Sequence, residues 1–181
     1  MKVFDFDNTI YDGESVVDFF LFAMKKKHEL IKYLPLMIYT ATLYKIGILS
    51  IDKLYELSSK MSNVIIKNKE DAEVFIREFW NGNQTKLKKE YLSIISEKDV
   101  IISASPRILL EGIQDKLKTK NIICSEFNIE TGKFEFLCFG PNKLIAFKKK
   151  FPNATIDEFY TDSKNDKPLM TISKNVHIVK K

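Results

Sequence analysis

The chain has 181 residues, of which 45% are hydrophobic; this excludes an intrinsically disordered protein and suffices for one core domain with room for an insertion. Its 29 basic and 24 acidic residues leave a net charge of +5, which mildly favours anionic ligands. The lysines are spread along the chain, and we interpret the runs at 25–27 and 148–150 as solvated helix faces in preference to nucleic-acid or membrane contacts.

Several features bear on the compartment of the protein. The two cysteines, Cys124 and Cys138, lack metal-ligand spacing, and we expect reduced, packed thiols in a reducing compartment. Asp5 and Asp7 interrupt the first apolar stretch, which therefore does not match a secretory signal. The longest uncharged run, residues 33–44, is too short to span a bilayer and predicts a buried helix. We expect a soluble, cytoplasmic protein without a transmembrane segment.

The first predicted strand covers residues 2–6 and ends in two carboxylates, Asp5 and Asp7. A turn at residues 6 and 7 would place both at the carboxyl end of the strand, where open α/β sheets bind ligands. Two like charges at that edge require a cation or a shared proton, and a carboxylate can also act as a nucleophile. The competing interpretation is an acidic turn that caps the following helix.

Residues 13–92 predict a block of helices. Ser15, with Asp18 three positions later, resembles a capping box before a helix that ends near Lys27. Further helices are predicted to begin at Ser50 and Asn68. Their apolar residues recur at helical spacing, which indicates packing more than a cofactor site; they are Leu54, Leu57 and Met61 in the first and Ala72, Phe75, Phe79 and Trp80 in the second.

From Asp99 onward, β-branched runs alternate with helical segments, which indicates a mainly parallel sheet. Strands are predicted at 100–103, 122–124, 156–161 and 176–179, helices at 106–117 and 143–150, and a β-hairpin from 127–129 and 133–139. The fold class is therefore α/β, a Rossmann-like, doubly wound sheet. Residues 1–12 and 93–181 would form its core, with the helical block inserted between them.

Six polar side chains lie at the boundaries of these predicted elements: Asp5, Asp7, Ser103, Lys143, Asp162 and Asp166. A parallel sheet would gather them along one edge. Converging carboxylates repel one another without a cation, and oxygen ligands at such an edge suit Mg²⁺. A serine hydroxyl and a lysine supply the neutral donor and the positive charge that a phosphate requires.

The ordered set resembles the four motifs of the haloacid dehalogenase superfamily of phosphohydrolases. The motifs are Asp5-Phe6-Asp7-Asn8-Thr9, then Ile101-Ile102-Ser103-Ala104-Ser105-Pro106, then Lys143, and finally Tyr160-Thr161-Asp162-Ser163-Lys164-Asn165-Asp166. The chain is similar to the branch, subfamily IB, that includes phosphoserine phosphatase and related small phosphatases. That branch carries a helical cap between its first and second motifs, where the helical block lies here.

The resemblance implies roles for the acidic residues. Asp5 would attack phosphorus and become an aspartyl phosphate. Asp7 would protonate the leaving oxygen and then activate water. Mg²⁺ would be held by the Asp5 carboxylate, the Asp7 backbone carbonyl and Asp162, with Asp166 supporting directly or through water.

The resemblance also implies a phosphate site. Ser103 and Lys143, with backbone amides near Phe6 and Asp7, would bind the phosphoryl oxygens. Phosphoryl transfer depends on positioning and charge neutralisation more than on elaborate chemistry. We therefore predict a magnesium-dependent phosphatase that hydrolyses a phosphomonoester of a small phosphorylated metabolite, with no nucleic-acid partner. A phosphate-binding or signalling module with the same pocket, and a phosphomutase, are the alternatives.

The sequence does not identify the substrate. Glu14 lies nine residues after Asp5, a spacing similar to that of a substrate-binding acid in phosphoserine phosphatase, but an acid at this position equally suits a helix N-terminus. Phosphoserine recognition in that family also uses a cap arginine, for which the helical block offers Arg77. The apolar helical block would also suit a larger, partly apolar phosphoester, including a lipid head group.

Overall fold

The computed structural model describes residues 1–51, 53, 55–56, 59 and 69–180. Its centre is a six-stranded sheet in the order β4-β3-β2-β1-β5-β6. The strands are β1 (Lys2–Asp5), β2 (Val100–Pro106), β3 (Ile122–Asn128), β4 (Lys133–Phe136), β5 (Ile156–Thr161) and β6 (Ser173–Ile178). Neighbouring strands run parallel except for the antiparallel β3–β4 hairpin, so the predicted α/β fold class is confirmed.

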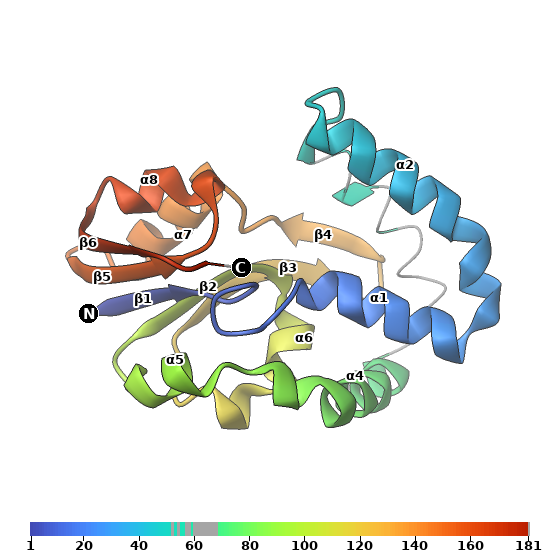
Figure 1. Cartoon of the computed structure of the whole chain (residues 1–181), viewed down its shortest axis with the longest axis horizontal. Helices are drawn as coiled ribbons and strands as arrows, with labels where there is room; N and C mark the ends of the chain where they lie inside the picture. The colour runs from blue at the N-terminus through green and yellow to red at the C-terminus, as the bar shows by residue number, and fades with distance from the viewer. Residues whose placement is uncertain (52, 54, 57–58, 60–68, 181) are drawn as a thin grey trace.

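Helices cover both faces of the sheet. The α-helices described are α1 (Ser15–Lys26), α2 (Leu34–Lys45), α4 (Lys69–Asn83), α5 (Lys89–Ile94), α6 (Arg107–Glu111), α7 (Pro141–Lys150) and α8 (Lys167–Met170). Short 3-10 helices lie at η1 (His28–Tyr33), η2 (Gln84–Lys86), η3 (Gln114–Lys116) and η4 (Lys164–Asp166). Figure 1 shows α7 and α8 on one face, and α4, α5 and α6 on the other, with α1 and α2 beyond the end of β1.

The alternation of side chains along the strands explains this two-faced arrangement. On β1, Phe4 belongs to a buried cluster with residues of α4 and α6, while Val3 belongs to a second cluster with Phe147 of α7. Strand β2 alternates in the same way, with Ile101 in the first cluster and Ile102 in the second. Because both faces are buried, these strands appear in the sequence as continuous apolar runs.

Helix α4 packs closely on α6. The indole Nε1 of Trp80 donates a hydrogen bond to the backbone carbonyl of Leu109 at 2.7 Å. Gly112, directly after α6, lies against Ile76 and Trp80. The last part of the predicted helical block therefore shares a hydrophobic cluster with the sheet, and the division of the chain at residues 13 and 92 stays a prediction.

Several predicted boundaries are corrected. The helix predicted over 106–117 ends at Glu111, because Ile113 has non-helical backbone angles and η3 follows. The strand predicted at 122–124 continues to Asn128 and absorbs the first arm of the hairpin. The last strand begins at Ser173 instead of residue 176. The residues that indicated a helix after Ser50, namely Leu54, Leu57 and Met61, lie outside the described residues, as does Asn68.

The segment 33–44 forms the predicted helix α2, but the prediction that it is buried was wrong. Leu34 and Met37 pack on the first cluster, whereas Ile38 is 59% and Tyr39 is 60% exposed. Within the part of the chain that the structure describes, only one side of this helix packs against other residues. Among the described residues, no helix is both long and apolar enough to cross a membrane.

The two thiols are free and buried, as predicted. Cys138 is fully buried and Cys124 is 2% exposed. Burial raises the pKa of each thiol to about 12, so that neither forms a thiolate readily near neutral pH.

The contact at Gly112 generates a stability prediction. A Cβ there would collide with Ile76 and lie 2.9 Å from Cδ1 of Trp80, so Gly112→Ala should lower the free energy of unfolding by about 1–3 kcal/mol. Gly82→Ala is the matched control, because a Cβ at that position in α4 meets nothing within 4 Å. It should raise stability by roughly 0.5–1 kcal/mol. Urea unfolding measures both; equal effects would contradict the packing of α4 on α6.

Candidate active site

The parallel register brings the predicted site residues to one edge of the sheet. Asp5 on β1 lies opposite Ile102 on β2, so that Ser103 follows at the next level. Phe4 lies opposite Tyr160 on β5, which places Thr161 level with Asp5 and Asp162 one residue beyond. These residues come from three adjacent strands whose carboxyl ends meet, the usual position of a ligand site in this class of sheet.

A buried ion-pair cluster lies at this edge. The Nζ atom of Lys143 lies 2.8 Å from Oδ1 of Asp5 and 2.9 Å from Oδ2 of Asp166. Lys143 is 3%, Asp5 5% and Asp166 1% exposed. The hydroxyl of Thr161 donates to the same Asp166 oxygen at 2.8 Å. Asp166 thereby holds the lysine against Asp5.

The start of α7 explains why the lysine reaches this edge. Gly140 precedes the helix with φ +53°, a left-handed conformation that glycine adopts without a Cβ clash. Pro141 occupies the first helical position, where its missing amide hydrogen costs nothing. Lys143 is therefore in the first turn of a helix that begins beside the sheet edge.

The Asp7 carboxylate is fixed by a separate set of donors. Its Oδ1 accepts the backbone amide of Ser15, the first residue of α1, at 2.6 Å. Its Oδ2 accepts the Ser105 hydroxyl at 2.8 Å and lies 3.5 Å from the hydroxyl of Ser103. The hydroxyls of Ser15 and Ser105 are themselves 2.8 Å apart. Asp7 is thus in the pocket and also bound to the start of α1, so both interpretations of this acidic turn have a structural basis.

The predicted capping box at Ser15 and Asp18 was wrong. The N-cap position belongs to Glu14, which makes no side-chain cap hydrogen bond. Asp18 instead accepts hydrogen bonds from the Tyr11 hydroxyl at 2.7 Å and the Lys86 ammonium at 2.8 Å. Tertiary contacts outside the helix determine the position of this carboxylate.

The electrostatics of the site follow from burial. Burial raises the pKa of the Asp5 carboxyl to about 7, and the Lys143 ammonium offsets only part of that rise. Burial also raises the pKa of Asp7, against the hydrogen bonds from Ser15 and Ser105. Burial alone would lower the pKa of Lys143, but Asp5 and Asp166 outweigh it and raise the pKa above its usual value. One ammonium is thus paired with two buried carboxylates, Asp5 and Asp166, and the half-buried carboxylate of Asp7 lies close by, a balance that favours a further cation.

The predicted magnesium ligands can be tested against this arrangement. Within the described part of the chain, no three His, Cys, Asp or Glu side chains converge as a metal site. The predicted set needs only two, Asp5 and Asp162, together with the backbone carbonyl of Asp7. These donors are all oxygen atoms, and Mg²⁺ is usually bound by one or two carboxylates while it keeps several waters, so the set fits. The structure gives Asp166 a contact with Lys143; its support of a metal stays a prediction.

The remaining predicted residues lie in different positions. The backbone amide of Phe6 donates to Asp5 Oδ1 at 2.9 Å, so this predicted phosphate donor lies directly beside Asp5. Glu14 is exposed and accepts a hydrogen bond from the Asn8 amide at 2.6 Å. Arg77 is exposed on α4 and is not among the described residues that line the cavity next to Asp7.

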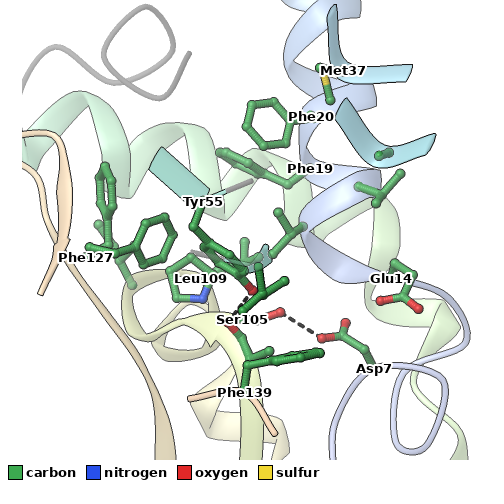
Figure 2. Close-up of a pocket in the computed structure, with 18 of the residues that line it drawn as sticks. Asp7, Glu14, Phe19, Phe20, Met37, Tyr55, Ser105, Leu109, Phe127 and Phe139 are labelled. Atoms are coloured by element: carbon green, nitrogen blue, oxygen red, sulfur yellow. Dashed lines mark hydrogen bonds between the residues drawn. The ribbon is translucent and has the colours of Figure 1, made fainter. Parts of the chain in front are cut away.

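That cavity has a volume of about 330 Å³ and is lined by α1, α2, and residues of the β2–β4 part of the sheet. Figure 2 shows Asp7 and Ser105 at one end, with Glu14 to one side and Phe19, Phe20 and Met37 at the opposite end. A carboxyl group whose pKa is raised by burial therefore faces a space large enough for a small organic ligand.

Sequence reasoning assigned no chemical role to three hydroxyl residues of this site. Ser15 and Ser105 bind Asp7 or each other, and Thr161 binds Asp166. Ser105 and Thr161 lie within the motif segments, each at a strand end, which is the signal that could have identified them. The local sequence around Ser15 is typical of a helix cap. Its contact with Ser105 could not be predicted, because their distance depends on how α1 lies against β2.

The burial of Asp7 predicts a trade-off between stability and function. Asp7→Asn removes a half-buried charge while its amide can still meet the Ser15 amide and the Ser105 hydroxyl. Because the pKa of Asp7 is raised, ionisation destabilises the fold increasingly as the pH rises above the ordinary value of 3.8. Without metal at about pH 8, the variant should be more stable than the wild type by an order of 1 kcal/mol. The difference should vanish near pH 4; thermal unfolding in EDTA measures it, and a less stable variant at the higher pH would be contrary to this account.

Comparisons with known proteins agree with this geometry. A family model described as haloacid dehalogenase-like hydrolase matches residues 3–171. No curated protein matches the chain. A protein of unknown function from Bordetella pertussis Tohama I has a similar structure, with a TM-score of 0.79 and 15% identity over 94% of this chain and 85% of that one.

Two other similar structures have informative names. A phosphoserine phosphohydrolase-like protein from Francisella tularensis subsp. tularensis SCHU S4 has a TM-score of 0.59 and 21% identity, over 98% of this chain and 95% of that one. A phosphoserine phosphatase, solved as an analogue of its phospho-aspartyl intermediate, has a TM-score of 0.53 and 16% identity, over 96% and 83% of the two chains. These likenesses show the fold, and the family match extends over nearly the whole chain. The chain therefore belongs to the haloacid dehalogenase-like hydrolase family.

Proposed function

We propose that this hydrolase is a magnesium-dependent phosphatase that cleaves a phosphomonoester through an aspartyl phosphate on Asp5. The observation that supports it most strongly is the contact of Lys143 with Asp5, 138 positions apart in the chain, beside Asp7 and Ser103. The family membership and the phosphoserine phosphatases of similar fold add to this support.

In the first step, a carboxylate oxygen of Asp5 forms a bond to phosphorus while the bond from phosphorus to the ester oxygen breaks. Asp7 transfers its proton to that oxygen, and the alcohol leaves. The raised pKa of Asp7 favours the protonated form that this transfer needs. Its hydrogen bonds with Ser15 and Ser105 hold it at the end of the cavity.

In the second step, a water oxygen forms a bond to phosphorus, Asp7 accepts the proton of that water, and the bond between phosphorus and Asp5 breaks. Inorganic phosphate and the original Asp5 carboxylate result. Lys143 and Ser103, together with the backbone amide of Phe6, would stabilise the negative charge on the phosphoryl oxygens in both steps.

The Asp5 carboxylate, the Asp7 carbonyl and Asp162 would hold the magnesium ion. Bound there, Mg²⁺ would neutralise charge on the phosphoryl group. The helices between the first two motifs, with α1 and α2 over the cavity, would act as the cap that contacts the leaving group.

The nucleophile is tested by Asp5→Asn, which keeps the shape of the side chain but removes the attacking carboxylate. We expect kcat to fall by about a thousandfold or more, because the residues of such a unit act together. Phosphate release from para-nitrophenyl phosphate with Mg²⁺ measures it. Asp115→Asn is the control, since Asp115 is exposed and, among the described residues, forms an ion pair with its neighbour Lys116. Turnover retained by Asp5→Asn would refute the mechanism. If the wild type binds phosphate but hydrolyses no phosphate ester, a binding module would be favoured instead.

The metal site is tested by thermal unfolding. Mg²⁺ at about 100 times its Kd should stabilise the EDTA-treated protein by about 2.7 kcal/mol, a rise in Tm of several degrees. Asp162→Asn should reduce this rise sharply, because it removes a predicted ligand, whereas Asp115→Asn should keep all of it. An undiminished response in Asp162→Asn would exclude that residue from the metal site whatever the activity of the enzyme.

A further inference from the structure

We infer that the substrate is the phosphomonoester of a long-chain, apolar alcohol. The inference rests on the phosphatase activity proposed above and concerns the group that leaves. The cavity of about 330 Å³ at Asp7 is lined by residues that are mostly aliphatic or aromatic. Its polar lining residues are Asp7, Glu14, Thr40, Tyr55 and Ser105.

The polar groups of this wall already have partners within the chain. The Thr40 hydroxyl donates to the backbone carbonyls of Leu36 at 2.9 Å and Met37 at 3.1 Å. The Tyr55 hydroxyl lies 3.4 Å from the carbonyl of Ala104, and the Ser105 hydroxyl donates to Asp7. A polar leaving group would lose its water on entry and gain few hydrogen bonds in return.

Charge in the cavity wall is also one-sided. Asp7 and Glu14 are acidic, and the described lining contains no lysine, arginine or histidine. The wall described here therefore has no group to pair with the carboxylate of phosphoserine or another acidic metabolite. Apart from its phosphate, the ligand that fits these contacts carries no negative charge.

The aromatic rings give the cavity its apolar character. Phe134 packs edge-to-face against both Tyr55 and Phe127, with ring centroids 4.8 Å and 5.0 Å apart. Phe19 and Phe20 are each 8% exposed and form part of the opposite wall. Figure 2 shows the rings of Phe19, Phe20, Tyr55 and Phe127 around the space that extends from Asp7 and Ser105. Such walls favour the burial of methylene groups.

An alkyl group longer than the cavity would still contact apolar side chains of the protein. Val17 of α1 lines the cavity and is 50% exposed. Leu21 lies four residues further on, on the same side of the helix, and is 47% exposed. A second exposed apolar side chain thus follows Val17 on the same row of α1.

The test compares n-alkyl phosphates from ethyl to octyl with phosphoserine and glycerol phosphate, all with Mg²⁺. Burial of each methylene should raise kcat/KM roughly fourfold until the cavity is full, so octyl phosphate should exceed ethyl phosphate by a hundredfold or more at this rough rate. If phosphoserine or glycerol phosphate is hydrolysed as well as octyl phosphate, the inference is overturned while the phosphatase stands. If no ester gives phosphate release that depends on Asp5, the proposed function fails as well.

A matched pair of variants localises the effect. Ala41 lines the cavity and is exposed, so Ala41→Glu should place a charge in the wall without crowding the core. It should lower the octyl-to-ethyl ratio of kcat/KM by tenfold or more, because an alkyl chain would have to pack beside a carboxylate. Thr42→Glu, next to it on α2 and outside the described lining, should leave the ratio unchanged. An octyl-to-ethyl ratio of kcat/KM that is the same in both variants would mean that the alkyl group binds elsewhere, which would contradict the inference.

A second comparison distinguishes a substrate that lies in a membrane from one that is dissolved in water. Octyl phosphate is offered as a monomer, and oleyl phosphate is offered in phosphatidylcholine vesicles. Hydrolysis in vesicles at a rate comparable to the monomer would assign the substrate to the membrane; hydrolysis of the monomer alone would assign it to a soluble ester. Both outcomes support an apolar leaving group, whereas rates no higher than that of ethyl phosphate in both forms overturn it.

Discussion

The buried ammonium of Lys143 is the interaction on which the rest of the site depends. It contacts Asp5 and Asp166 from α7, while Thr161 holds Asp166 from β5. A buried charge is tolerated only when it is paired, so this cluster ties the helix to the sheet edge and leaves little freedom in where Asp5 points. The single ammonium does not balance the carboxylates around it. The charge that remains is what makes the edge suited to a cation and a phosphoryl group together.

Asp7 joins this polar edge to the apolar cavity. Its two oxygens are held from different parts of the chain, one by the first amide of α1 and the other by Ser105 of β2. The position of the proposed acid therefore depends on the position of α1, which also supplies part of the cavity wall. A leaving group that packs against α1 would press on the same helix that orients the proton donor. In the proposed mechanism, contact with the leaving group and proton transfer would thus be coupled through one element.

The errors of the sequence-based predictions share a physical cause. Helical spacing at Ile113 and Leu117 indicated one helix from residue 106, but α6 ends at Glu111, where Gly112 lies against Ile76 and Trp80 of α4. The uncharged run at 33–44 indicated a buried helix, yet only one side of α2 finds a partner among the described residues. In each case the local pattern was correct about the type of element, and packing against a distant segment decided its extent or burial.

The sequence by itself determined the class of the fold, the positions of Asp5, Asp7, Ser103 and Asp162 at or just after strand ends, and the family, because strand periodicity and the order of the motifs can be recognised along the chain without its tertiary contacts. Tertiary structure alone decided the pairing of Lys143 with both Asp5 and Asp166, the support of Asp7 by Ser15 and Ser105, and the enclosure of an apolar cavity. These features require side chains far apart in sequence to meet. Their distances are set by the sheet register and by the way the helices pack on it, neither of which a local pattern contains.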